Sequence, residues 1–244
     1  MITVLPITAR MQIDQMTPEQ ARAHLTEIRA QIATAAKVAG RRADATTLIA
    51  VSKTHPAEAI TPFIAAGQLH FGENRVQEAQ DKWPALRATT PDVKLHLIGS
   101  LQSNKAEDAV ALFDVIHSVD RPSLITALSR AQAKQGLARD YFIQVNIGEE
   151  AQKGGCAAVD LPALLLQARD AGLAIVGLMA VPPAKLEAAP FFALLAKLAR
   201  DQNLRGLSMG MSGDLAPAVM LGATHVRVGT ALFGVREERV SVRS

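Results

Sequence analysis

Lys53 lies at the end of a predicted strand, a position in which its amine could react. Lys53 directly follows LIAVS, residues 48–52, which reads as a buried strand although lysine is among the residues least often buried. If the strand end keeps the amine partly away from water, its pKa falls and the free amine can form a Schiff base with a carbonyl compound. The alternative is a lysine whose stem lies along apolar surface while its ammonium reaches water.

Two glycine-containing segments in the last part of the chain favour a phosphate site. In MSGD, Ser212 and Gly213 are expected to open a helix, whose free backbone N–H groups can bind an anion. In GTALFG, Gly229 and Thr230 offer a close backbone approach and a hydroxyl donor. Each segment alone is explained as well by a helix cap or a tight turn. Their occurrence together favours a phosphomonoester.

Arg227 narrows the choice of ligand. In HVRVG the alternation of a strand turns Val226 and Val228 to one side and Arg227 to the other. An inward arginine near a phosphate site can face the pyridine nitrogen of pyridoxal 5'-phosphate (PLP), a position that takes an Asp or Arg partner. Two alternatives stay open. Arg227 can form a salt bridge between layers of the interior, and Lys53 can serve a sugar-phosphate aldolase.

The elements that carry these residues alternate as strands and helices. Strand-like segments recur about every 25 residues, which is typical of repeated βα units with parallel strands. Eight such units predict a (β/α)8 TIM barrel, whose active face lies at the carboxyl ends of the strands. A doubly wound open sheet is the rival fold. The expected strands cover residues 48–52, 68–72, 94–99, 114–119, 141–147, 175–181, 207–210 and 224–229.

An extra helix is expected in front of the barrel. Thr17 can cap it, Pro18 suits its first position, Gln20 completes a capping box and Gly40 ends it. The clearest later helices are expected at residues 121–136, 160–172 and 189–202.

Length and composition limit the classes of protein to consider. Residues 1–16 are expected to be a loose tail and residues 17–244 a single domain, because no linker or change in composition interrupts them. The net charge of +3, without clustered basic and aromatic residues, argues against a nucleic-acid partner. No segment has the length of a membrane span or the pattern of a signal peptide, and the single cysteine, Cys156, fits a reducing compartment. We expect a cytoplasmic protein without a membrane partner or a metal site.

Eight segments resemble, in order, the sequence blocks of the YggS/PROSC family, which are PLP-binding proteins of vitamin B6 homeostasis. The segments are LIAVSKTHP, HFGENRVQEAQDKW, HLIGSLQSNK, HSVD, QVNIGEEAQKGG, GLMAV, LSMGMSGD and VRVGTALFG. They run from about residue 20 to residue 234. The resemblance implies an alanine-racemase-like (β/α)8 barrel without the second β domain of the racemase.

The resemblance also implies a role for each matched residue. Lys53 matches the Schiff-base lysine of the family, and Asn74 matches a residue near the ring oxygen of the cofactor. Arg227 matches the arginine that faces the pyridine nitrogen. The phosphate cradle is matched by Ser212, Gly229 and Thr230.

The expected function is the reversible storage and release of PLP, held as a lysine Schiff base, without established turnover. An arginine donates to the ring nitrogen and leaves it unprotonated, so the ring is a weak electron sink. Racemases with this arrangement still work, but they use two bases, the lysine and a tyrosine from another domain. Tyr141, the single tyrosine of this chain, is expected at the start of strand five, far from the active end. The short segment after strand eight also leaves no room for a second domain.

The alternatives are a PLP-dependent amino-acid racemase and a class I aldolase. The expected partners of the carrier are PLP and apo PLP-dependent enzymes, and the expected state is a monomer. Lys105 and Lys153, on loops near the site, are candidates to receive the aldehyde on its way out.

Overall fold

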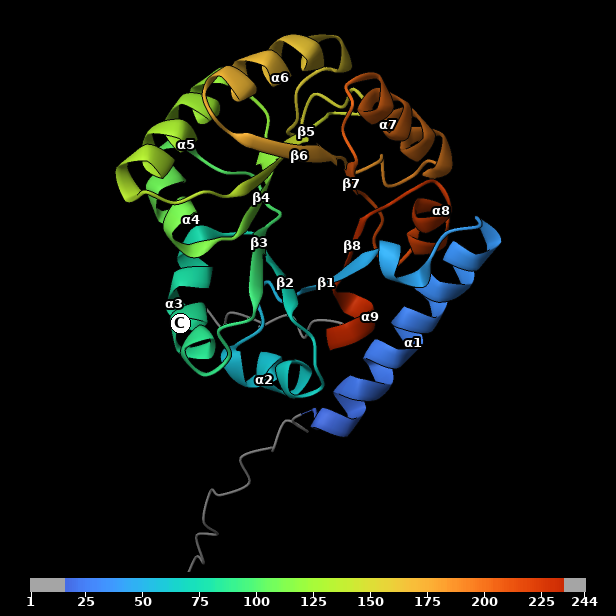
Figure 1. Ribbon diagram of the computed structural model, residues 1–244. Helices are drawn as coiled ribbons and strands as arrows, with labels where there is room; N and C mark the ends of the chain where they lie inside the picture. The colour runs from blue at the N-terminus through green and yellow to red at the C-terminus, as the bar shows by residue number, and fades with distance from the viewer. Residues whose placement is uncertain (1–15, 235–244) are drawn as a thin grey trace, which may run out of the picture.

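A closed barrel of eight parallel strands forms the centre of the molecule (Figure 1). The computed structural model describes residues 16–234. The strands are β1 (Thr47–Val51), β2 (His70–Glu73), β3 (Lys94–Leu97), β4 (Val115–Val119), β5 (Asp140–Gln144), β6 (Ala174–Met179), β7 (Gly206–Ser208) and β8 (His225–Val228). β1 pairs with β8, with Leu48 opposite Val226 and Ala50 opposite Val228. This pairing closes the ring, confirms the predicted (β/α)8 barrel and excludes the open sheet.

Helices surround the barrel and connect successive strands (Figure 1). Within the described residues they are α1 (Pro18–Val38), α2 (Ala57–Ala65), α3 (Val76–Thr89), α4 (Ala106–Leu112), α5 (Pro122–Gln135), α6 (Leu161–Asp170), α7 (Ala189–Asp201), α8 (Leu215–Met220) and α9 (Thr230–Phe233). Short 3-10 turns cover Ala43–Ala45, Ser103–Lys105 and Ala158–Asp160.

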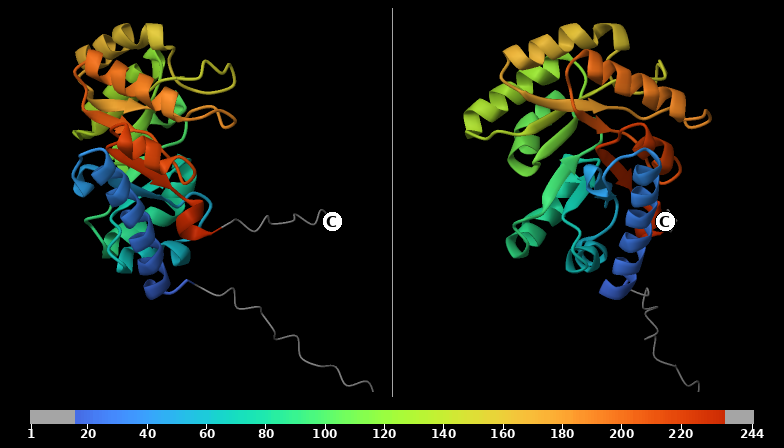
Figure 2. Two further views of the ribbon diagram at one scale, coloured as in Figure 1. Left: turned by 90° about the vertical axis from the view of Figure 1, so that its right-hand side faces the viewer. Right: turned by 45° about the vertical axis from the view of Figure 1, so that its right-hand side comes forward.

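The extra helix α1 completes the outer layer. It packs between α8 and α2, while α9, the helix that follows β8, has only four residues (Figures 1 and 2). The predicted capping box is present, because Gln20 N donates to Thr17 Oγ1 at 3.2 Å and Thr17 N donates to Gln20 Oε1 at 2.7 Å. Gly40, with φ 65°, follows the end of the helix, as predicted.

Strands β5 and β7 are shorter than predicted at the end that carries the candidate site. β5 stops at residue 144, because Val145 forms an isolated bridge with Cys156. β7 stops at residue 208, because the chain turns at Gly210, which has φ 94°. Both differences place loop backbone at the carboxyl end of the barrel, where polar side chains follow the strands.

The predicted loose tail lies outside the described residues, except for Met16, which packs against the core. Between residues 16 and 234, no helix is long and apolar enough to cross a membrane. The same part of the chain contains no group of three or more His, Cys, Asp or Glu side chains placed to hold a metal ion.

Candidate functional site

β1 brings Lys53 to the carboxyl end of the barrel, where the strand passes into a tight turn. Lys53 is half-buried and is the second residue after β1. His55 N donates to Ser52 O at 3.1 Å, and Thr54, within the turn, has φ 65°. This left-handed region is unfavourable for a β-branched residue, so contacts from outside the turn must hold its conformation.

Lys82, on α3, supplies those contacts. Its side chain is 8% exposed, and its Nζ donates at 2.9 Å to the carbonyl oxygens of Ser52 and His55, on either side of Lys53. Nζ also donates at 3.0 Å to Glu78 Oε1, which accepts from the backbone N–H that follows Lys53. One buried ammonium thus fixes the turn that carries the candidate amine.

Glu73, the last residue of β2, balances this ammonium. It is fully buried, and its Oε1 lies 2.9 Å from Lys82 Nζ. The same oxygen accepts from Ser52 Oγ at 2.6 Å and from Trp83 Nε1 at 3.0 Å. Burial raises the pKa of the Glu73 carboxyl, and the neighbouring Lys82 opposes that rise. We name Glu73 and Lys82 the buried ion pair; it ties the ends of β1 and β2 to α3.

The sequence interpretation assigned no role to Lys82, although one signal marks it. The buried face of α3 includes Val76, Ala79, Trp83 and Leu86, and Lys82 lies on the same face. A lysine within a buried apolar stripe requires a charged partner nearby. The helical period therefore predicts that Lys82 has a charged partner. It does not predict which turn of the chain Lys82 holds.

Arg227, on β8, lies inside the barrel, as the alternation of the strand predicts. It is 5% exposed, and its guanidinium donates to Ser208 Oγ at 2.7 Å and to Ala180 O at 3.0 Å. Burial lowers the pKa of Arg227 to about 10, which still leaves the side chain charged at neutral pH. A fixed positive charge thus lies inside the barrel beside the ends of β6 and β7.

Ser212 differs from its prediction. It is exposed in a turn and does not open a helix, because α8 begins at Leu215 with Asp214 in the capping position. Met211 N donates to Asp214 Oδ1 at 2.5 Å, so the turn closes on the aspartate. Serine and aspartate compete for the same position before a helix, and the sequence interpretation chose the wrong one.

Gly229 and Thr230 do open a helix, since α9 begins at Thr230 with Gly229 in the capping position. The first N–H groups of a helix have no acceptor within it. A Cβ built on Gly229 would lie 3.4 Å from both Cβ and O of Val51, at the end of β1. Because Lys53 follows Val51 by two residues, the pairing of β1 with β8 brings the lysine turn and the start of α9 to the same part of the barrel rim.

Asn74 lies at the same end of the barrel, directly after β2, and is partly buried. A Cβ built on Gly99, after β3, would come within 2.3 Å of Asn74 O. The glycine therefore permits a close approach of the two loops. The structure places the lysine turn, Arg227 and the start of α9 on adjacent strands, whereas Asn74 follows the neighbouring strand β2 on the far side of β1.

Three other residues considered for chemistry are engaged elsewhere. Lys153 Nζ donates to Pro182 O at 2.9 Å and pairs with Glu150, and Lys105 pairs with Asp108 at 3.3 Å. Tyr141 lies at the predicted end of β5, where it is the second residue because the strand begins one residue earlier than predicted. It is buried, and burial raises its pKa to about 12. Its hydroxyl donates at 3.1 Å to Gln132 Oε1 on α5, outside the barrel.

This fold and these residues define an alanine-racemase-like (β/α)8 barrel protein with a lysine after its first strand and an arginine on its last. The family model described as alanine racemase, N-terminal domain, matches residues 23–237. A pyridoxal phosphate homeostasis protein of Pseudomonas aeruginosa is 43% identical over 222 residues, which cover 88% of this chain and 95% of that protein. One of Escherichia coli is 37% identical over 226 residues, with 88% and 96% covered. The chain belongs to this family of pyridoxal phosphate homeostasis proteins, which confirms the resemblance seen in the sequence.

Solved structures agree with this assignment. PipY of Synechococcus elongatus, solved with PLP bound, is 42% identical, with a TM-score of 0.77 and with 88% of this chain and 100% of that chain covered. An alanine racemase of Clostridium difficile has a TM-score of 0.71 at 11% identity, and covers 92% of this chain and 59% of that one. At that identity the racemase shares the fold alone.

Proposed function

We propose that this protein binds PLP as a Schiff base with Lys53 and releases it reversibly. The pairing of β1 with β8 is the observation that carries the proposal. It places the turn with Lys53, which Lys82 holds, beside strand β8. β8 carries the buried Arg227 and leads into the start of α9. A phosphorylated pyridine aldehyde needs an amine, an anion site and a partner for its ring nitrogen. The bound PLP of PipY, at 42% identity, supports the same ligand here.

Each residue has a distinct part in this proposal. The unprotonated Nζ of Lys53 attacks the aldehyde carbon, a C=N bond forms and one water molecule leaves, and hydrolysis reverses the step. Arg227 faces the pyridine nitrogen, and Asn74 lies near the ring oxygen. The phosphate is bound by Ser212, Gly229 and Thr230. The donor set fits PLP, since it offers one amine, one buried cation, one helix start and two hydroxyl groups.

The same residues favour a carrier over a racemase. Arg227 is charged and can only donate, so the ring nitrogen stays unprotonated and the bound ring remains a weak electron sink. The Tyr141 hydroxyl is bound to Gln132 on the outer side of β5, away from the strand ends. It is therefore not placed to act as the second base that racemisation requires.

The further parts of the proposal concern partners. We propose that the recipients are apo forms of PLP-dependent enzymes, and that the protein acts as a cytoplasmic monomer without nucleic-acid or membrane partners. The modest charge of +3, without clustered basic and aromatic residues in the sequence, supports the part that excludes a nucleic-acid partner.

The test combines two measurements on the PLP-loaded protein. Mixed with an apo PLP-dependent enzyme, the loaded protein should restore that enzyme's activity. Incubated with a panel of amino acids in heavy water, it should exchange no Cα hydrogen faster than free PLP at the same concentration. Rapid exchange of one amino acid, abolished in Lys53→Ala, would establish a racemase instead. Failure to take up PLP, with uptake of a sugar phosphate on Lys53, would favour the aldolase.

The phosphate loops give a separate prediction. Thr230→Ala and Ser212→Ala are each expected to weaken PLP binding about 5- to 150-fold, because one hydrogen bond to a charged group contributes about 1–3 kcal/mol. The dissociation constant of PLP measures the effect, and Thr230→Ser, which keeps a hydroxyl, is the matched control. If the native protein binds pyridoxal as tightly as PLP, the phosphate site is wrong.

A further inference from the structure

A row of hydrogen-bonded side chains crosses the barrel interior and ends at Arg227. His70, His96 and His117 lie on the neighbouring strands β2, β3 and β4. His70 Nδ1 is 3.0 Å from His96 Nε2, and His96 Nδ1 is 3.0 Å from His117 Nε2. His117 Nδ1 is 2.9 Å from Ser208 Oγ, which accepts from Arg227 at 2.7 Å. We name the three histidines and Ser208 the histidine relay.

The two central histidines of the relay are neutral. His96 is 1% exposed and His117 is fully buried, and burial lowers the pKa of both well below 6.5. A neutral imidazole has one N–H and one bare nitrogen. Both ring nitrogens of each histidine face a relay partner. His96 and His117 must therefore each donate one hydrogen bond to one relay neighbour and accept one from the other. Both histidines must donate in the same direction along the relay.

Arg227 decides that direction. A guanidinium only donates, so Ser208 Oγ accepts from it. In the described part of the chain, Ser208 Oγ has only Arg227 and His117 as hydrogen-bond partners. Its own proton is satisfied only if it is donated to His117 Nδ1, and a buried hydroxyl without an acceptor is costly. His117 then donates through Nε2 to His96, and His96 donates through Nε2 to His70.

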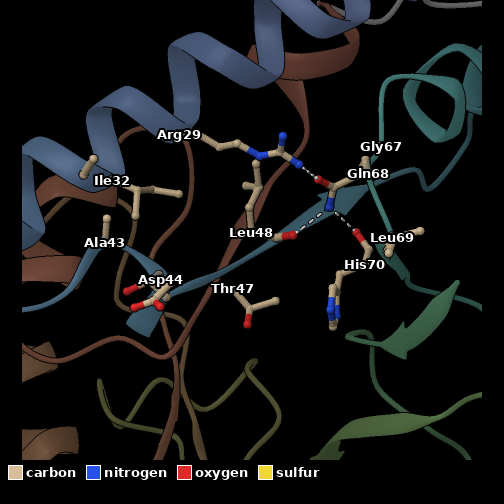
Figure 3. Close-up of a pocket in the computed structure, with 12 residues that line it drawn as sticks. Arg29, Ile32, Ala43, Asp44, Thr47, Leu48, Gly67, Gln68, Leu69 and His70 are labelled. Atoms are coloured by element: carbon tan, nitrogen blue, oxygen red, sulfur yellow. Dashed lines mark hydrogen bonds between the residues drawn. The ribbon is translucent and has the colours of Figure 1, made fainter. Parts of the chain in front are cut away.

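The relay ends where water can reach it. His70 is partly exposed and lines a pocket of about 570 Å³ at the amino end of the barrel, opposite the rim that carries Lys53. Figure 3 shows His70 beside Gln68, whose Nε2 donates at 2.7 Å to the carbonyl oxygens of His70 and of Leu48. These bonds fix the His70 backbone, while its ring accepts from His96 and can donate to solvent.

We propose that the histidine relay positions Arg227. Every hydrogen bond of the relay is donated in the direction from Arg227 toward His70. Together these bonds hold the guanidinium in the orientation in which it meets the pyridine nitrogen of PLP. Aligned hydrogen bonds polarise one another, so Ser208 Oγ accepts more strongly from Arg227 than an isolated hydroxyl does. The part that concerns the ring nitrogen rests on the proposed function. The alignment of the relay does not.

His225 provides a matched control inside the same barrel. Its ring centroid lies 6.0 Å from that of His96 and 5.9 Å from that of His117. Its Nδ1, however, is 2.9 Å from Thr224 Oγ1, outside the relay. A substitution at His225 disturbs the packing of the interior histidines without removing a bond of the relay.

The alignment is tested first in the native protein without PLP. Long-range proton–nitrogen correlation spectra of histidine-labelled protein at neutral pH report which ring nitrogen carries the proton. We expect His96 and His117 both to carry it on Nε2. A proton on Nδ1 of either residue would overturn the proposal. This readout needs neither PLP nor a variant, so it stands even if the protein binds another ligand.

Variants then test the link to Arg227. In Ser208→Ala the donor to His117 is gone, so His117 and His96 are expected to populate both tautomers, whereas His225→Gln leaves them on Nε2. With PLP loaded, Ser208→Ala is expected to release PLP about tenfold faster, while Ser208→Thr, which keeps the hydroxyl, restores the native rate. Unchanged tautomers in Ser208→Ala would overturn the relay and leave PLP binding intact as a separate result.

Discussion

Lys53→Ala is expected to abolish covalent PLP binding completely. The native protein, incubated with PLP and reduced with borohydride, should carry one added pyridoxyl phosphate on the peptide that contains Lys53, and the variant should carry none. The physical reason is that the buried ion pair holds the turn that carries Lys53 at the barrel rim, whereas the amine of Lys82 beside that turn is buried and paired with Glu73. Absorbance before reduction and peptide mass after it are the two measurements.

Two control variants make the result specific. Lys153→Ala removes a lysine already engaged by Pro182 O and Glu150, and it should keep the full adduct. Lys53→Arg keeps a positive charge but lacks a nucleophilic amine, and it should bind PLP only without a covalent bond. If the adduct persists in Lys53→Ala, wholly on another lysine, the assignment of Lys53 fails while PLP binding itself survives.

The sequence predicted the barrel because its signals are local and repeated. Strands recur about every 25 residues, and eight parallel βα units of that size give the number of strands and roughly the length of a (β/α)8 barrel. The side of β8 that carries Arg227 followed from the alternation of a strand. The capping box of α1 followed from Thr17 and Gln20, which are only three residues apart. In each case the residues that decide the structure are neighbours in sequence.

The parts that the sequence did not predict depend on side chains that meet across the fold. Lys82 reaches a carbonyl oxygen 30 residues earlier, and Ser208 reaches His117 across 91 residues. No periodicity within a strand or helix encodes such pairs. The prediction for the segment around Ser212 fails for a different reason. Ser212 and Asp214 are both residues that commonly precede a helix, and the turn in which Met211 N donates to Asp214 Oδ1 delays the start of α8 to Leu215.

The histidine relay could not be predicted from the sequence of the strands that carry it. His70, His96 and His117 each lie on a short strand, so each alone reads as a partly buried strand residue. Only the order of the strands around the barrel brings them side by side. Their partner Ser208 comes from β7, on the opposite part of the ring, so the relay spans the barrel and does not follow one sheet edge.

Lys82→Ala is expected to lower the free energy of unfolding by about 3–5 kcal/mol, because it leaves the Glu73 carboxylate buried without its partner. It also frees the carbonyl oxygens of Ser52 and His55, so the strained turn at Thr54 loses its support. Urea unfolding of the protein without PLP measures the first effect. The rate of PLP release from the loaded protein measures the second and should rise.

Two comparisons show whether the cost of Lys82→Ala comes from breaking the buried ion pair or from the loss of one positive charge. Lys197 and Asp201 form an exposed pair four residues apart on one helix, so Lys197→Ala should cost at most about 1 kcal/mol. The double variant Lys82→Met with Glu73→Gln removes both charges, and it should recover part of the stability that Lys82→Ala loses, since no unpaired charge stays buried. It should not recover slow PLP release, because the methionine cannot donate to the turn. If Lys82→Ala costs no more than Lys197→Ala, the ion pair does not hold the turn that carries Lys53.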